Sequence, residues 1–190
     1  MGCFNFVPKL KQSESEEPVS QLRDALVERL IESYRAYFDV ETLPGGLSLK
    51  ARCAYHSRAS QYVLVKTAEL WAAENHEYLY LHSLPVLTGQ EVERIVGDVL
   101  ADGMPRIKPH KEHMYTYLTA IVVYDGAEPG ALEALTKVKK RREFKLSLHG
   151  WMELRIAAVD TSTGEISTNR CARDLKKSLR PIVDVAIKSI

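Results

Sequence analysis

The residues whose types and spacing point most directly to chemistry form a dense cluster of cations. Five of six consecutive positions carry Lys or Arg: Lys137, Lys139, Lys140, Arg141 and Arg142. Further cations follow at Arg170, Arg173, Lys176 and Lys177. Such a density of cations can neutralise phosphates, which indicates a phosphate or nucleic-acid contact. A helix C-terminus also favours cations through its dipole. Because the net charge is only +1, a solvated helix end is the favoured interpretation and nucleic acid the alternative.

Two histidines and a carboxylate lie close together at His110, Glu112 and His113. A zinc-protease helix places its ligands at HExxH spacing, which is absent here, and Pro109 predicts a loop. We therefore expect packed or solvent-facing histidines, and the sequence predicts no metal and no cofactor. Aromatic residues are the other candidates: Trp71 and Trp151, with nine tyrosines, could stack on bases or a partner, although most such residues pack in cores.

Periodicity predicts the elements that must position these residues. Residues 1–18 are expected to be a mobile arm, and a helical stripe follows from Val19 to Phe38. Alternation predicts strands over residues 47–56, 61–70, 77–82, 114–124 and 165–168. Helices are expected over 88–103, where Thr88 and Glu91 form a capping box, and over 129–138. A last helix is expected after an N-cap at Asn169, and Pro181 either interrupts it or begins another helix.

The segment around Gly150 permits two interpretations. A two-residue hairpin at His149 and Gly150 would set Leu146 opposite Glu153, which opposes a core residue to a charge. A continuous strand places its apolar side chains on one face. The pattern therefore predicts one long strand over 143–160, bent near Gly150.

Composition limits the class of protein. The chain has 190 residues, 45% of them hydrophobic and 27% charged, which is typical of a soluble globular domain. Three widely spaced cysteines without a CxxC pair indicate a reducing, cytoplasmic location. Together with the element order, this predicts an α+β fold: one domain over residues 19–190 with a mixed, mostly antiparallel sheet of about six strands.

The order helix, three strands, helix, strand resembles the core of the PD-(D/E)xK nucleases. That resemblance implies an Asp and a Glu-x-Lys on adjacent strands, which hold Mg²⁺. The corresponding region around Glu77 lacks the lysine, and Glu153-Leu154-Arg155 is a degenerate echo that cross-strand ion pairing would explain as well.

Several segments are similar to a family of uncharacterised prokaryotic proteins, found mainly in anaerobic bacteria. They are SRASQYVLVK (57–66), LWAAE (70–74), HMYTY (113–117), LHGWM (148–152) and TNR (168–170). The resemblance spans residues 45–180 and implies a cytoplasmic prokaryotic protein. Because no activity is assigned to the family, it carries no site residues over.

The function that the sequence favours is binding or regulation without catalysis, with an unknown ligand. The alternatives are a nucleic-acid-associated protein or divergent nuclease that uses the basic cluster, and a small-molecule enzyme with a site of scattered His, Glu and Arg. A homo-oligomer or a protein partner remains open, and no membrane partner is expected, because no apolar run approaches the ~20 residues that span a bilayer.

Overall fold

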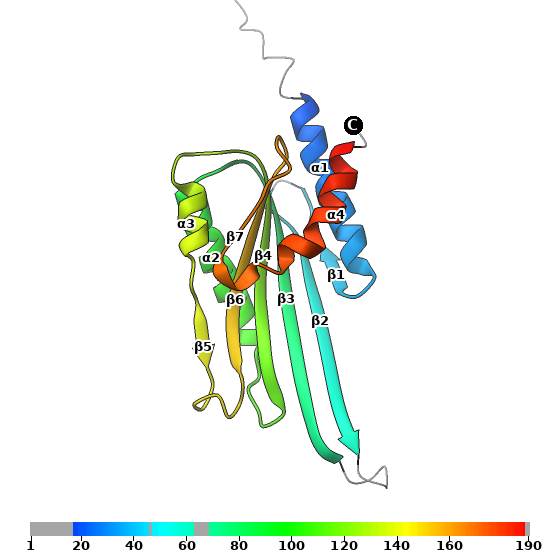
Figure 1. The fold of residues 1–190 in the computed structure, drawn as a ribbon, viewed down its shortest axis with the longest axis vertical. Coiled ribbons are helices and arrows are strands. Elements are labelled where there is room, and N and C mark those ends of the chain that lie inside the picture. Colours follow the sequence, from blue (N-terminus) through cyan, green and yellow to red (C-terminus); the bar gives the residue numbers. More distant parts are fainter. Residues whose placement is uncertain (1–16, 46, 63–68, 189–190) are drawn as a thin grey trace, which may run out of the picture.

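The computed structural model describes residues 17–45, 47–62 and 69–188 (Figure 1). The arm expected over 1–18 lies outside them, except that Glu17 and Pro18 begin the first helix. The elements are α1 (Glu17–Arg35), β1 (Asp39–Thr42), β2 (Leu49–Tyr62), β3 (Glu69–Leu87), α2 (Gly89–Gly103), η1 (Met104–Arg106), β4 (His113–Ala127), α3 (Ala131–Lys137), β5 (Arg141–Glu143), β6 (Trp151–Asp160), β7 (Ile166–Thr168), η2 (Arg170–Ala172) and α4 (Leu175–Lys188).

The seven strands of the described residues form one mixed sheet in the order β1-β2-β3-β4-β6-β5, with β7 also paired to β6. The α+β class is confirmed. The expectation of about six mostly antiparallel strands is wrong, because the central pairings β3–β4 and β4–β6 are parallel. Helical connections through α2 and α3 return the chain to the same end of the sheet, which makes these neighbours parallel. Strand β1 was not predicted, since four residues are too few to show a period.

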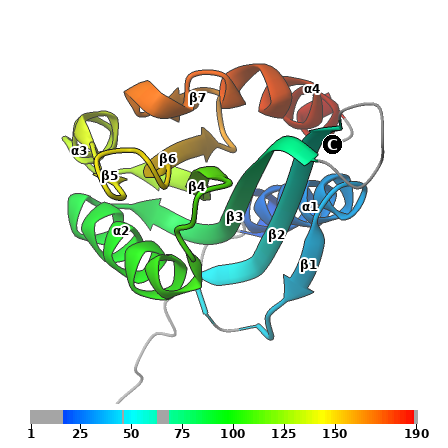
Figure 2. The ribbon, with the colours of Figure 1, turned by 90° about the horizontal axis from the view of Figure 1, so that it is seen from below.

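Helices cover both faces of the sheet (Figure 2). On one face α1 and α4 pack with apolar side chains from β2, β3, β4 and β6: Leu30 of α1, for example, lies in one core with Leu79 and Ile121. Cys53 is buried there as a small core side chain, and burial raises its pKa to about 12. On the other face α2 and α3 pack with residues such as Ile95, Leu118 and Leu154. None of the helices in the described part of the chain has both the length and the apolar character needed to cross a membrane.

The predicted helix over 88–103 is confirmed as α2. Thr88 is its N-cap, and the Oγ1 atom of Thr88 accepts the backbone N–H of Glu91 at 3.0 Å. The Glu91 carboxylate pairs with Arg94 at 2.5 Å. The inward positions Val92, Ile95 and Val99 are buried as the periodicity predicted.

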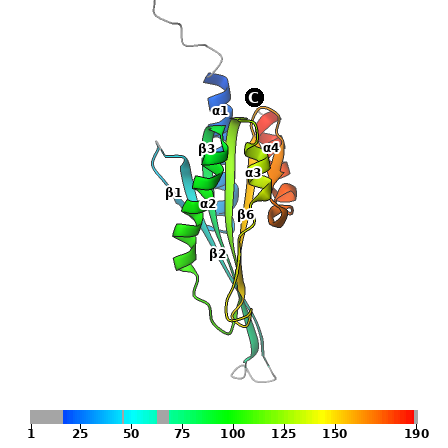
Figure 3. The ribbon, with the colours of Figure 1, turned by 90° about the vertical axis from the view of Figure 1, so that its left-hand side faces the viewer.

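The strand expected over 61–70 is corrected. Its residues 63–68 lie outside the described residues, and its two ends belong to different strands, Gln61 and Tyr62 to β2, Glu69 and Leu70 to β3. In Figure 3, β2 and β3 reach below the helices. The C-terminal helix also differs from both expectations, because Pro181 neither interrupts it nor begins another: α4 continues through Pro181 to Lys188.

The single strand expected over 143–160 is wrong. Strands β5 and β6 form a hairpin in which Arg141 faces Glu153 and Glu143 faces Trp151. Residues 144–150 form its loop, where Lys145, Leu146 and Ser147 all have positive φ angles. Such a backbone cannot continue a strand. The apolar alternation was misleading, because Leu146 is 92% exposed and does not belong to the core.

Asn169 does not cap α4. Its side chain is fully buried, and its Oδ1 accepts the N–H of Ile156 at 3.2 Å. Its Nδ2 donates to the carbonyls of Leu154 at 3.0 Å and Val138 at 3.1 Å. Strands β5 and β7 pair with different parts of the same edge of β6, and Asn169 satisfies the backbone between them. An amide side chain suits this gap because it both donates and accepts.

Replacing Gly150 by alanine tests how tightly the hairpin loop is held. Gly150 has φ +76°, and a Cβ would lie 2.6 Å from the backbone oxygen of His113 and closer still to that of Met114. We expect Gly150→Ala to lower the free energy of unfolding by about 2 kcal/mol. Urea denaturation measures this. Gly97→Ala is the control: its Cβ meets nothing within 4 Å in helix α2, so it should be neutral or stabilising, and a similar loss in both variants would contradict the assignment.

Candidate functional site

The face that carries α1 and α4 is covered over only part of its area, since β2, β3, β4 and β6 continue below both helices (Figure 1). We call this lower part the open face. Tyr55 of β2, Glu77 of β3, Tyr117 of β4 and Glu153 of β6 are successive partners across it. In the next row, Tyr115 of β4 is the partner of Trp151 of β6.

Aromatic rings follow one another along the open face. The ring centroids of Tyr115 and Tyr117 are 4.7 Å apart, and those of Tyr115 and Trp151 are 5.7 Å apart. The guanidinium of Arg141 lies 4.9 Å from the centre of the Trp151 ring. All three rings are half-buried, so each keeps some surface in contact with solvent. The side chain of Trp71, the other tryptophan considered above, lies outside the described residues.

The structure divides the basic cluster. Lys137 ends α3 and pairs with Glu133 at 2.6 Å, as a helix-end cation would. Lys139 and Lys140 are exposed between α3 and β5. Because neighbouring residues of a strand point to opposite faces, Arg141 lies on the open face and Arg142 contacts the Phe144 ring from the other side, at 5.8 Å.

One of the additional cations directly precedes a residue that contacts the open face. Arg170 belongs to η2, whose next residue, Cys171, donates to Glu153 at 3.1 Å. Burial raises the pKa of the Cys171 thiol, and the charges of Arg170 and Arg141 both oppose this shift. Arg173, Lys176 and Lys177 are exposed at the start of α4.

A buried arginine lies where the open face meets the helices. The side chain of Arg155 is 5% exposed and pairs with Asp174 at 2.6 Å and with Glu77 at 3.5 Å. Its guanidinium also lies 4.6 Å from the centre of the Tyr117 ring. Its Nε atom has no hydrogen-bond partner among the described residues. Sequence analysis missed this site, although an arginine within the apolar run of β6 was a signal, because a buried charge needs a partner.

A cavity of about 500 Å³ opens above Arg155 and Glu77, between the sheet, the C-terminal end of α1 and α4. Tyr34, Phe38 and Tyr55 line one side, with ring centroids 5.2 Å and 5.4 Å apart in turn. Tyr37 stands at the rim and is 79% exposed. Burial, and then the charge of Glu77, raise the pKa of Tyr34, so its hydroxyl stays protonated.

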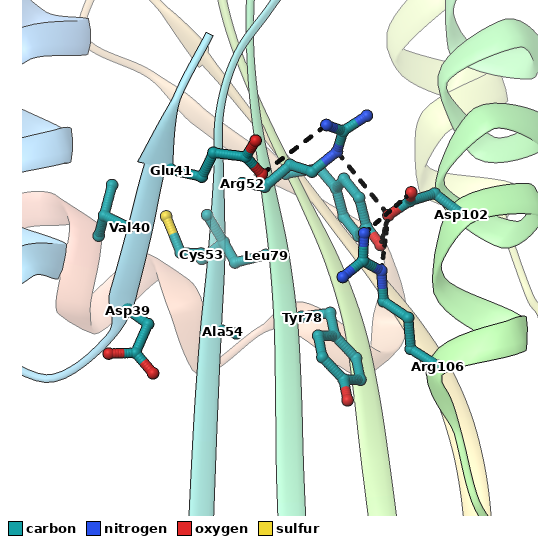
Figure 4. A pocket seen from close by; sticks show the side chains of 11 residues that line it. Asp39, Val40, Glu41, Arg52, Cys53, Ala54, Tyr78, Leu79, Asp102 and Arg106 are labelled. Atoms are coloured by element: carbon teal, nitrogen blue, oxygen red, sulfur yellow. Dashed lines mark hydrogen bonds and ion pairs between the residues drawn. The ribbon is translucent and has the colours of Figure 1, made fainter.

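A second cavity, of about 300 Å³, lies between β1, β2 and the end of α2 (Figure 4). Its charged groups satisfy one another: Asp102 accepts hydrogen bonds from Tyr80 at 2.7 Å and from Arg106 at 3.0 Å. Burial raises the pKa of Asp102, but these hydrogen bonds outweigh it and leave that pKa below its usual value. Arg52 approaches the same carboxylate at 3.8 Å. This network braces α2 against the sheet.

Histidines gather on the opposite face of the sheet. The Nδ1 atoms of His56 and His76 are 2.8 Å apart, and His110 pairs with Glu74 at 3.1 Å. His113 is buried, and its ring contacts the carbonyl of His149 at 2.7 Å and Thr116 at 2.8 Å. Across residues 17–45, 47–62 and 69–188, no three His, Cys, Asp or Glu side chains are arranged to hold a metal ion.

The residues considered for a nuclease are engaged in ion pairs. Glu153 faces Arg141, its cross-strand partner, at 3.9 Å, and Arg155 holds Glu77. The structure thus supports cross-strand ion pairing for Glu153 and Arg155.

Comparison with known proteins adds the family. A family model described as a domain of unknown function, DUF8052, matches residues 23–181. The chain belongs to the DUF8052 family. No curated protein and no solved structure matches it. The DUF8052 match spans α1 to the middle of α4 and therefore includes the open face and the cavity above Arg155.

Proposed function

We propose that this DUF8052 domain is a binding protein, without catalytic activity, whose ligand is single-stranded nucleic acid held on the open face. The observation that carries the proposal is the aromatic row of Tyr117, Tyr115 and Trp151 with Arg141 beside it. Proteins that bind single strands combine rings on which bases stack with cations that follow the backbone. Arg141 of the basic cluster lies at the edge of this row, and Lys139 and Lys140 precede it in the chain.

The arrangement favours a single strand over a duplex. Rings that lie on a sheet surface can reach the flat face of a base only when that base is unstacked. The exposed cations Lys139, Lys140 and Arg170 lie next to β5 and β6, where phosphates would pass once bases rest on the rings. The three scattered cysteines support a reducing, cytoplasmic location for such a protein, and the resemblance described above supports a prokaryotic source.

Labelled single-stranded DNA and RNA, and the matching duplexes, should be titrated with the full chain across a salt series. We expect single strands to bind more tightly than duplexes, with an affinity that falls by about 0.7 logarithmic units per phosphate contact for each tenfold rise in salt. No binding at low salt would overturn the proposal and leave a protein partner as the ligand of the open face. Equal binding of duplex would contradict stacking on the open face.

Charge reversal identifies the surface. The variant Lys139→Glu, Lys140→Glu, Arg141→Glu should bind single strands at least about tenfold more weakly at moderate salt, with a smaller salt slope, because up to three phosphate contacts are lost. Trp151→Leu should weaken binding by about 1–3 kcal/mol through the loss of one stacked base. The control is Lys108→Glu with Lys111→Glu, two exposed cations between η1 and β4. An equal loss in the control would mean that net charge alone attracts the strand.

A further inference from the structure

The cavity above Arg155 continues directly from the aromatic row. Glu77 at its floor is the cross-strand partner of Tyr117 on one side and of Tyr55 on the other. Arg155 contacts both Glu77 and the Tyr117 ring. A strand whose bases stack on Trp151, Tyr115 and Tyr117 therefore arrives at this cavity with its next base.

We propose that the cavity admits one base of the bound strand edge-on and recognises guanine. This inference rests on the proposed function and deepens it: the open face binds any sequence, and the Arg155 pocket supplies the preference for a base. The volume, about 500 Å³, lies within the range of small-molecule sites.

The hydrogen-bonding groups at the floor fit the edge of guanine. The Nε–H of Arg155 is a buried donor that lacks a partner among the described residues, and a group of this kind in a native structure calls for an acceptor. Glu77 beside it is an acceptor, and the contacts it makes with Thr119 and Arg155 both use Oε1. Guanine presents a carbonyl acceptor, O6, next to two donors, N1–H and N2–H. Adenine, cytosine and uracil each lack one part of that set.

The local charge excludes the phosphate from this pocket. Arg155 carries one positive charge, while Glu77 and Asp174 carry two negative charges between them. A neutral base with donors is therefore favoured over an anionic phosphate. The phosphates would remain at the edge of the sheet, beside β5 and the exposed lysines.

The walls of the pocket suit a flat ring. Phe38 and Tyr55 form one wall, and the exposed ring of Tyr37 stands free at the rim. An exposed tyrosine ring at the mouth of a cavity can close over a bound base and stack on it. Tyr37 is 79% exposed and is not part of either hydrophobic core, so its truncation leaves the fold intact.

The test measures binding of oligouridylates of one length to the full chain at one salt concentration. The oligouridylates carry a single central guanine, adenine or cytosine, or no substitution. We expect the strand with guanine to bind at least about tenfold more tightly than the others. Tyr37→Ala and Arg155→Lys should each reduce this ratio to near one; Arg155→Lys keeps the charge but removes the Nε–H. The control is Val86→Ala. Val86 is exposed near the C-terminal end of β3, nine residues after Glu77, and its truncation should leave the ratio unchanged.

The outcomes separate this inference from the proposed function. Salt-dependent binding of every strand with no preference for guanine overturns the pocket assignment and leaves the open face intact. A preference for guanine that survives in Tyr37→Ala and Arg155→Lys also overturns it, because recognition would then lie elsewhere. If no strand binds but free guanosine does, the pocket is a nucleoside site and both proposals fail.

Discussion

Replacing Arg155 by methionine is expected to lower the free energy of unfolding by about 3–5 kcal/mol. Methionine fills a similar volume but leaves Glu77, whose side chain is 18% exposed, without the cation that compensates its charge. Asp174 loses the same partner at less cost, because its side chain is 72% exposed and solvated. The contact with the Tyr117 ring is lost as well. Urea denaturation at pH 7 measures the change.

A double variant shows whether the loss comes from charge or from packing. Arg155→Met combined with Glu77→Gln removes both charges, and glutamine can still accept the hydrogen bond from Thr119. We expect the double variant to be more stable than Arg155→Met alone, because the uncompensated carboxylate is gone. Equal stability of the two would show that lost packing, not the buried charge, accounts for the effect.

This pair of variants also separates stability from binding. A buried ion pair contributes little net stability compared with apolar residues of the same volume, so stability alone does not explain why Arg155 and Glu77 are present. If the pair recognises a base, the double variant should fold and bind single strands through the open face, but without preference for guanine. Stability and recognition then respond to different substitutions of the same two residues.

The local elements were predictable because their signals are local. Helix α2 has a capping residue at Thr88 and a stripe of buried residues at helical spacing, and both are present in the structure. The alternation over residues 47–56 likewise predicted a strand, and residues 49–56 belong to β2. Strand pairing was less accessible, since the parallel neighbours β3, β4 and β6 are joined through helices and no local pattern specifies which strands meet.

The hairpin before β6 shows where an apolar pattern fails. Leu146 and Leu148 continue the alternation of a strand, yet both are exposed in a loop with left-handed backbone. Hydrophobic spacing reports which side chains could share a face, not whether the backbone is extended. The same limit applies to Asn169, whose side chain hydrogen-bonds the backbone of β6 and does not cap the helix that follows.

The candidate site was predictable only in part. The basic cluster was evident in the sequence, but the opposite directions of Arg141 and Arg142 depend on the short strand β5. Arg155 of β6 and Glu77 of β3 meet because only β4 lies between these two strands. That neighbourhood follows from the strand order of the sheet, which the sequence did not reveal. Long-range pairing therefore creates the pocket, and the arginine in an apolar strand was its one local sign.

Acidification is expected to destabilise the protein through His82, by about 3 kcal/mol between pH 7 and pH 4. Burial, and then the charge of Arg94, lower the pKa of His82 to about 4. The ring is 2% exposed, and neither nitrogen has a hydrogen-bond partner among the described residues. In the unfolded chain this histidine takes up a proton near pH 6.5, whereas in the folded protein it stays neutral until about pH 4. Its contribution is therefore complete above pH 6.5, declines as the pH falls, and levels off below pH 4.

The variant His82→Leu isolates this effect from the other groups that titrate in the same range. Leucine cannot take up a proton and leaves no unpaired nitrogen in the core, so the variant should lose less stability than the natural chain on going from pH 7 to pH 4. All other ionisable groups are the same in both proteins, so their contributions cancel in the difference. Urea denaturation at pH 7, 6, 5 and 4 gives the two curves. Parallel curves would show that folding does not lower the pKa of His82 and would contradict the prediction. A gap that widens as the pH falls from 6.5 would show that the sheet holds a neutral imidazole in its core and loses stability in acid for that reason.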